Sequence, residues 1–188
     1  MPYQLADFCA DADKALAADP GTAGRMALRG FLEQLLANRA FVERELGPDE
    51  PSGVKRLYED PKGRFLVLGH INRKPSNNSA HDHGPSWAVY GMAMNYTDMT
   101  EYRRADSGGD DVPAVLEKTR EYRLNEGQAV LFDTGVIHAL RRALETRLIR
   151  VTGGDLDTMV RRRYDLATGR VTTMEPTAEV SRRAMESA

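Results

Sequence analysis

Three of the four histidines in this chain of 188 residues stand where they could bind one metal ion. His81 and His83 are separated by one residue, and residues two apart on a β-strand point to the same face. His138 lies far along the chain, but antiparallel pairing of two strands easily closes such a separation. Neutral imidazole is a good ligand for iron, zinc, copper and nickel, and three protein ligands leave positions open for substrate. The spacing therefore indicates a three-histidine metal site.

The same histidines also have ordinary structural interpretations. The pair close to Pro85 could belong to a solvated loop, and a single histidine such as His138 could be a hydrogen-bonded core residue. We expect a structural role for His70, which lies in an apolar stretch with no polar partner nearby. Asp82 should point away from the pair, where it either orients a neighbouring imidazole or is solvated.

Two helical segments are predicted before the histidines. Residues 5–16 place apolar side chains at helical spacing, and Asp19-Pro20-Gly21 ends this stripe. Residues 22–46 carry a broad apolar face that ends at Gly47-Pro48. Because neither segment brings polar side chains together, we interpret residues 1–50 as a helical cap.

From residue 54 onward, short β-rich stretches alternate with turn sequences, as is typical of an antiparallel sandwich or barrel. We expect this β domain to span residues 54–174. The polar residues 175–188 would form a tail, with a short terminal helix as one option. The predicted strands are residues 54–58, 64–71, 87–96, 121–124, 129–132, 137–140, 147–152, 159–164 and 170–174.

The composition is that of an ordinary globular protein, 41% hydrophobic and 29% charged, with a net charge of −2. This charge gives no bulk attraction to nucleic acid or to a membrane surface. The runs Arg141-Arg142 and Arg161-Arg162-Arg163 lack interleaved aromatics, so we interpret them as solvated or ion-paired strand residues. No long apolar stretch or secretory signal is visible, and a cytoplasmic location is expected by default. Cys9 is the only cysteine, which excludes an intrachain disulfide.

Residues 127–138 resemble the second cupin motif, in which Gly, five residues, Pro, one residue, Gly, two residues and His follow one another. Only the proline departs, because Asp133 stands there. His81 and His83 match the histidine pair of the first cupin motif, but residues 84–88 lack the glutamate ligand that should follow. The resemblance implies an all-β double-stranded β-helix (cupin, jelly-roll) barrel behind the helical cap. Its metal site would have three histidines and no glutamate.

Within the cupins, the glutamate-free site and residues 87–91 are similar to bacterial thiol dioxygenases of the cysteine and 3-mercaptopropionate dioxygenase group. Residues 151–169 are similar to that group's closing hairpin, so the resemblance covers about residues 22–173. It implies non-haem Fe(II), with zinc, nickel or manganese as other options. A small anionic substrate and dioxygen would be the partners. Because cupins often dimerise through sheet edges, a homodimer is also an option.

One part of the resembled family's site is missing. The family carries a Ser-x-His-x-Tyr triad on the strand after the third ligand, and Leu148, Arg150 and Thr152 occupy those positions here. If Arg150 faces the barrel interior, its guanidinium would clamp a carboxylate or phosphonate; if it faces outward, it would pair with a surface acid. We give the two orientations equal weight. Tyr90 is a candidate to line the same pocket, whereas Trp87 is expected to pack in the core.

Three functions stay open on these grounds. The first is an iron dioxygenase of a small anionic substrate, with a thiol such as cysteine or 3-mercaptopropionate as one candidate. The second is a non-redox cupin lyase or isomerase that uses zinc, nickel or manganese. The third is a cupin that binds a small molecule without catalysis. The retained histidines count against the third, and the missing triad counts against an ordinary thiol dioxygenase.

Overall fold

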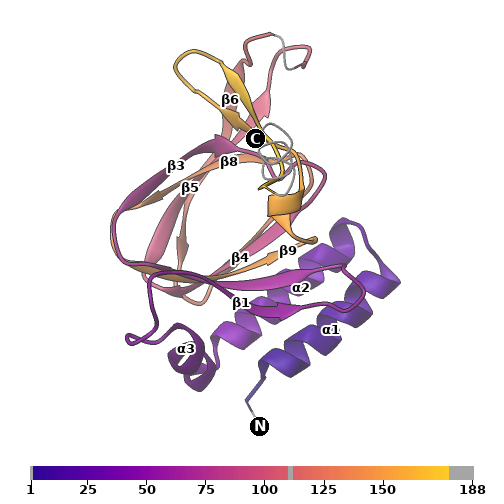
Figure 1. Ribbon diagram of the computed structural model, residues 1–188, viewed down its shortest axis with the longest axis vertical. Helices are drawn as coiled ribbons and strands as arrows, with labels where there is room; N and C mark the ends of the chain where they lie inside the picture. Colours follow the sequence, from indigo (N-terminus) through magenta and orange to yellow (C-terminus); the bar gives the residue numbers. More distant parts are fainter. Residues whose placement is uncertain (1, 110–111, 178–188) are drawn as a thin grey trace, which may run out of the picture.

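The chain begins with three helices that lie together against one face of the β structure (Figure 1). The computed structural model describes residues 2–109 and 112–177. In this part of the chain, no helix is both long and apolar enough to cross a membrane. The helices are α1 (Leu5–Ala18), α2 (Thr22–Leu36) and α3 (Arg39–Leu46).

The predicted helix over residues 22–46 is wrong, because two helices occupy this stretch. The side chain of Asn38 accepts a hydrogen bond from the amide of Phe41 at 3.2 Å, which caps the start of α3. The same side chain donates to the carbonyl of Tyr3 at 2.9 Å and so ties the break to the start of the chain. Apolar residues continue on both sides of the break, so periodicity alone predicts one helix.

The described residues then form eleven strands and a short 3₁₀ turn (Leu156–Thr158). The strands are β1 (Gly53–Glu59), β2 (Leu66–Asn72), β3 (Ser76–His81), β4 (Ala88–Met94), β5 (Tyr96–Arg104), β6 (Leu116–Asn125), β7 (Ala129–Phe132), β8 (Ile137–Arg142), β9 (Thr146–Thr152), β10 (Arg161–Tyr164) and β11 (Val171–Met174).

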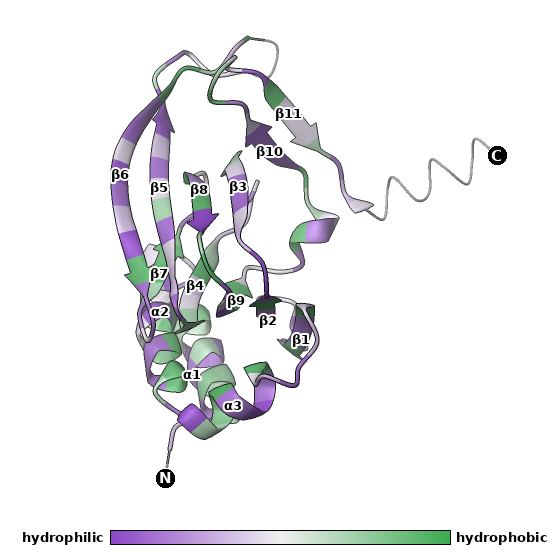
Figure 2. Cartoon of the chain, turned by 90° about the vertical axis from the view of Figure 1, so that its left-hand side faces the viewer, coloured by the Kyte–Doolittle hydropathy of each residue, from purple (hydrophilic) through white to green (hydrophobic). Residues whose placement is uncertain are grey.

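These strands make two antiparallel sheets that face each other (Figures 1 and 2). The first sheet has the order β1-β2-β9-β4-β7, and the second has the order β11-β10-β3-β8-β5-β6. Within them, β2-β9-β4-β7 lies opposite β3-β8-β5-β6, which is the strand order of a jelly roll. The fold is therefore a double-stranded β-helix barrel of the cupin type with an N-terminal helical cap, as predicted.

The second sheet contains two strands that the sequence pattern did not predict, β3 and β5. Strand β3 reads Ser-Asn-Asn-Ser-Ala-His and buries only Ala80, so it lacks the apolar alternation that marks a strand. The predicted strand over residues 87–96 stops at Met94, because Asn95 adopts a φ of 62° and turns the chain into β5. Strand β6 begins at Leu116, earlier than the predicted residue 121.

The first sheet is covered by the helices on its outer face. Ile149 and Val151 of β9 belong to the same buried apolar cluster as Leu32 and Leu36 of α2. Helix α2 comes so close that a Cβ atom at Gly91 would lie 2.7 Å from both leucine side chains. This packing anchors β4 and β9, two strands whose other face looks into the barrel.

Cys9 is buried in the helical layer as a free thiol. The expectation of a polar tail over residues 175–188 falls mostly on residues 178–188, which lie outside the described residues.

Candidate metal centre

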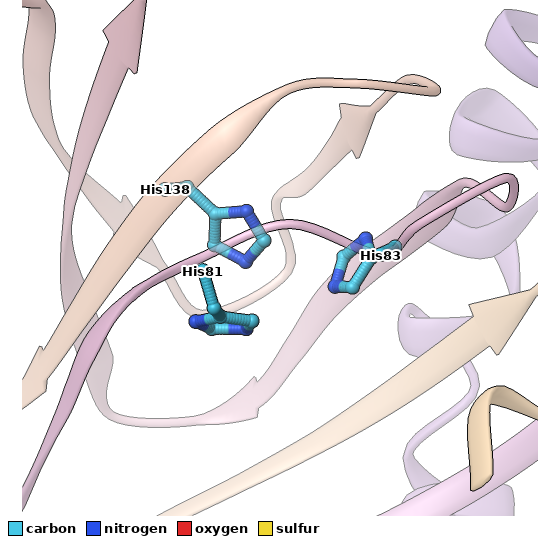
Figure 3. A group of neighbouring side chains, drawn as sticks. All are labelled: His81, His83 and His138. Carbon is cyan, nitrogen blue, oxygen red and sulfur yellow. The ribbon is translucent and has the colours of Figure 1, made fainter. Parts of the chain in front are cut away.

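Three histidine side chains converge between the two sheets (Figure 3). His81 ends β3 and pairs directly with His138 of β8 in the antiparallel ladder, so both side chains enter the barrel from neighbouring strands. One potential ligand atom from each of the two, and one from His83, lie within 4.8 Å of one another. The ring centroids of His81 and His138 are 4.5 Å apart. This cluster could hold a metal ion.

His81 and His83 do converge, but not by sharing one face of a strand as their spacing suggested. His83 lies beyond the end of β3, so the two residues do not share one face of a strand. Instead, the buried carboxylate of Asp82 anchors the backbone between them. It accepts hydrogen bonds from the amides of Gly84 at 2.9 Å and Arg162 at 3.0 Å.

A third bond to Asp82 comes from the hydroxyl of Tyr164 on β10, which donates at 3.0 Å. Burial and this hydrogen-bonded carboxylate raise the pKa of Tyr164 well above its usual range. The hydroxyl therefore keeps its proton and remains a donor at neutral pH. Of the two roles expected for Asp82, solvation is wrong: the carboxylate holds the histidine loop against the C-terminal hairpin.

Each imidazole of the cluster is oriented by its surroundings. The Nδ1 atom of His81 lies 2.8 Å from the carbonyl oxygen of Ser79, to which its N–H donates, and Nε2 is left free. Phe132 stacks on His138 with a centroid distance of 3.8 Å and an interplanar angle of 10°. Both ring nitrogens of His138 and Nδ1 of His83 are buried without a hydrogen-bond partner among the described residues. A shared cation would satisfy the acceptor nitrogen of each ring.

The electrostatics of the cluster favour neutral imidazoles. Burial lowers the pKa of His81, His83 and His138, and the guanidinium groups of Arg150 and Arg161 lower it further at the first two. The neutral form is the one that binds a metal ion. The three side chains are thus ready to act as ligands without first losing protons.

No carboxylate joins the group in the described part of the chain. Glu101 of β5 pairs with His138 in the ladder, which makes it an acidic candidate for the group. Its carboxylate instead accepts a hydrogen bond from the hydroxyl of Tyr122 at 2.7 Å and lies 3.7 Å from the guanidinium of Arg120. A cation held by the three histidines would keep its full positive charge and attract anions.

His81 is the cluster histidine that lines a polar cavity of about 370 Å³ between the sheets. Four arginines line this cavity, and no described aspartate or glutamate does. Its lining residues are His70, Asn72, Asn77, Asn78, Ser79, His81, Tyr90, Leu140, Arg142, Leu148, Arg150, Arg161, Arg163 and Met174.

Arg150 takes the inward of its two predicted orientations. It lies between Leu68 of β2 and Tyr90 of β4 in the first sheet, and it lines the cavity. Its Nε atom is buried without a partner in the described chain. Tyr90 is 3% exposed, and its hydroxyl lies 3.4 Å from Nε2 of His83. Both residues therefore stand beside the histidine cluster, whereas Trp87 packs in the helical core as expected.

The arginine runs were only partly interpreted correctly. Arg141 is solvated and pairs with Asp98 at 2.7 Å, as expected. Arg142 instead points inward, where it is 9% exposed and donates to Oδ1 of Asn78 at 2.7 Å. Strand alternation was the available signal, because residues two and four positions after His138 share its face.

Arg161 and Arg163 of β10 and His70 of β2 were also missed as cavity residues. His70 does not join the metal cluster, but it is not isolated in an apolar strand either. Burial, with the guanidinium groups of Arg150 and Arg142, lowers its pKa to about 3. It therefore presents a neutral imidazole to the cavity at physiological pH.

No protein-family profile matches the sequence, and no functionally curated protein matches it. Solved structures with a similar strand arrangement include KdgF from Halomonas sp. at 10% identity and a TM-score of 0.41, covering 54% of this chain and 77% of that one. The cupin domain of Schizosaccharomyces pombe Cnp3 is 9% identical with a TM-score of 0.43, covering 57% and 71%. A cupin-2 domain protein from Shewanella frigidimarina is 10% identical with a TM-score of 0.41, covering 58% and 88%. Such values leave the function to be inferred from the residues of the site.

Proposed function

We propose that this protein is a metal-dependent oxidoreductase, a non-haem Fe(II) dioxygenase that acts on a small anionic substrate. One observation carries the proposal: three uncharged histidines, with no described carboxylate in the group, lie beside a cavity that His81 and four arginines line. Such a donor set suits iron and leaves coordination positions for a substrate and for dioxygen. A thiol acid such as cysteine or 3-mercaptopropionate is the first substrate to test.

The three imidazoles of His81, His83 and His138 would hold the iron. Bound there, iron supplies the one-electron redox chemistry that lets dioxygen react with an organic substrate. The hydrogen bond from Nδ1 of His81 to the carbonyl of Ser79 leaves Nε2 as the ring nitrogen that would bind the ion. Stacking by Phe132 fixes the ring plane of His138 in the same way.

Arg150 and Tyr90 are the residues that would act on the substrate. The guanidinium of Arg150 presents paired N–H donors that match a carboxylate, and it would orient the substrate toward the histidines. The hydroxyl of Tyr90, beside Nε2 of His83, can donate a hydrogen bond to a substrate atom near the ion. Because Tyr90 is buried, water is kept from competing with the substrate for this hydrogen bond.

The test combines metal analysis with oxygen uptake. Protein purified without a chelator should contain about one iron per chain and should consume oxygen with cysteine, 3-mercaptopropionate or a simple carboxylic acid. His138→Ala should lose the metal and all turnover. Arg150→Met should keep the metal and lose substrate affinity by roughly ten- to a hundredfold, because one charge-assisted contact disappears.

Two outcomes would overturn parts of the proposal. Full activity with zinc in place of iron would sink the dioxygenase and leave a non-redox cupin enzyme. Unchanged metal content and ligand binding in His138→Ala would sink the metal centre itself. Arg141→Met is the matched control for Arg150→Met, because it removes the same charge from a solvated position.

A further inference from the structure

The cavity beside the histidines holds more positive charge than one carboxylate can neutralise. Arg142, Arg150 and Arg163 form no ion pair with any carboxylate that the structure describes. Arg161 pairs with Asp157, whose side chain is 72% exposed. Guanidinium groups gathered in a partly buried cavity repel one another unless anions lie between them.

These cations form two separate groups around the metal cluster. The second sheet places β10, β3 and β8 side by side, with His81 on the middle strand. On one flank, Arg163 pairs with His81 in the ladder, and Arg161 lies two residues earlier on β10. On the other flank, Arg142 of β8 and Arg150 of β9 enter from opposite sheets.

The second of these groups has the features of a built anion site. The guanidinium of Arg142 is held by Oδ1 of Asn78 at 2.7 Å and by the hydroxyl of Ser76 at 3.4 Å. Its Nε atom and that of Arg150 are buried without a partner among the described residues. Burial lowers the pKa of Arg142, and nearby Arg150 lowers it further. Nε2 of His70 is buried and unpartnered in the same cavity.

We propose that the substrate carries two separate anionic groups, one held by Arg142 and Arg150 and the other by Arg161 and Arg163, with its reacting atoms between them at the histidines. The second anionic group would be a carboxylate or a phosphoryl group, since a guanidinium fork matches both. A cavity of about 370 Å³ suits a short-chain diacid or a phosphorylated short-chain acid. This inference rests on the proposed function, because it names the substrate class of the same site.

Binding calorimetry with matched probes tests the inference. Glutarate and 3-phosphonopropionate each carry two anionic groups, and butyrate carries one. We expect at least one of the two dianions to bind wild-type protein about ten- to a hundredfold more tightly than butyrate. The tighter of the two identifies the second group as a carboxylate or a phosphoryl group.

Variants assign the two flanks. Arg163→Met should weaken the preferred dianion about tenfold or more and leave butyrate almost unchanged, which erases the preference. Arg150→Met should weaken both kinds of probe. Arg103→Met removes an equally positive, solvated side chain that pairs with Glu117, and it should behave as wild type. Because Arg163 is itself exposed, we expect its replacement to leave folding intact.

The outcomes separate this inference from the proposed function. Equal binding of butyrate and both dianions, no binding of any probe, or an unchanged preference in Arg163→Met overturns the two-anion substrate. Metal content is measured on the same preparations, and the titrations are repeated after dialysis against EDTA. A dianion preference in protein that never contains metal would support the anion sites and overturn the metalloenzyme. Protein that contains metal but binds butyrate and the two dianions equally would support the metal centre and overturn the two-anion substrate.

Discussion

The two faces of the first sheet differ in chemistry, and strand β9 shows the difference residue by residue. Ile149 and Val151 point outward into the apolar layer beneath the helices. Leu148 and Arg150 point inward and line the polar cavity. The larger buried apolar cluster lies on the helical face, whereas the barrel interior combines a smaller apolar cluster with arginines that have no ion-pair partner among the described residues. The helical cap thus adds apolar burial to a jelly roll whose interior is partly given over to a polar cavity.

The largest expected effect is on stability at the helical face. Leu32 is fully buried against the sheet, beside Gly91. Leu32→Ala should lower the free energy of unfolding by about 2–5 kcal/mol, because it leaves a cavity in a packed core. Chemical denaturation measures this change. Met26→Ala on the same helix is the control, since Met26 is 43% exposed and should cost little. A loss below about 1 kcal/mol for Leu32→Ala would contradict the assignment of the main core to this face.

The second prediction moves to the loop that carries two of the histidines. Asp82→Asn weakens three hydrogen bonds that fix the backbone between them. We expect metal affinity to fall by about ten- to a hundredfold, as for other residues that orient ligands. Competition with a chromophoric chelator measures the affinity. Tyr164→Phe removes only one of the three bonds and should give a smaller loss.

A merely structural role for Asp82 would give a different result. Stability would then fall while the metal affinity of the folded fraction stayed the same. Asp98→Asn is the matched control, because Asp98 pairs with Arg123 and Arg141 on the second sheet. It should leave metal affinity unchanged.

The sequence predicted the parts of the molecule that follow simple periodicity. The apolar stripes of α1 and α2 and the β-rich stretches of β2 and β9 were visible because these elements bury apolar side chains. The histidines were visible because they are rare and match a spaced motif. Strand β3 was invisible for the reason that makes it functional: its inward residues face a polar cavity.

The cavity arginines were missed for a related reason. A basic pair on a strand suggests solvent exposure, yet Arg141 and Arg142 lie on opposite faces of β8. Which of the two is buried depends on the pairing of β8 with β3, a long-range contact that local pattern does not encode. Arg163 is harder still, because it reaches the site only through the pairing of β10 with His81.

The third prediction contrasts two arginines on opposite faces of β9. Arg147 donates to the carbonyl of Leu46 and to Glu145, so Arg147→Met should cost about 1–3 kcal/mol by leaving these groups unpaired. Arg150 has no such partners among the described residues, and Arg150→Met should raise stability by about 1 kcal/mol. Denaturant unfolding at low salt measures both. A loss of stability in both variants would mean that Arg150 serves the fold and not a ligand.

The smallest expected effect is on the pH dependence of stability, and it tests whether the cavity between the sheets is shielded from water. His70 has a pKa of about 3 in the folded protein and an ordinary value near 6.5 in the unfolded chain. Between these two pH values the unfolded chain binds a proton that the folded protein does not. The contribution of His70 to the free energy of unfolding is therefore complete above pH 6.5 and is lost as the pH falls toward 3. His70→Gln should therefore lose stability less steeply between pH 6.5 and 5, by up to about 1.4 kcal/mol per pH unit.

Unfolding curves at pH 7, 6 and 5 measure this difference in slope. The charged and titratable groups that line the cavity with His70 are His81, Tyr90, Arg142, Arg150, Arg161 and Arg163, and all of them remain in the variant. Arg141→Met, which changes only the outer surface, should follow the wild-type curve. Equal slopes for wild type and His70→Gln would mean that His70 is solvated and takes up its proton normally. The cavity would then be open to water. It would differ from the buried helical face of the first sheet in solvent exposure, and not in holding buried charged groups.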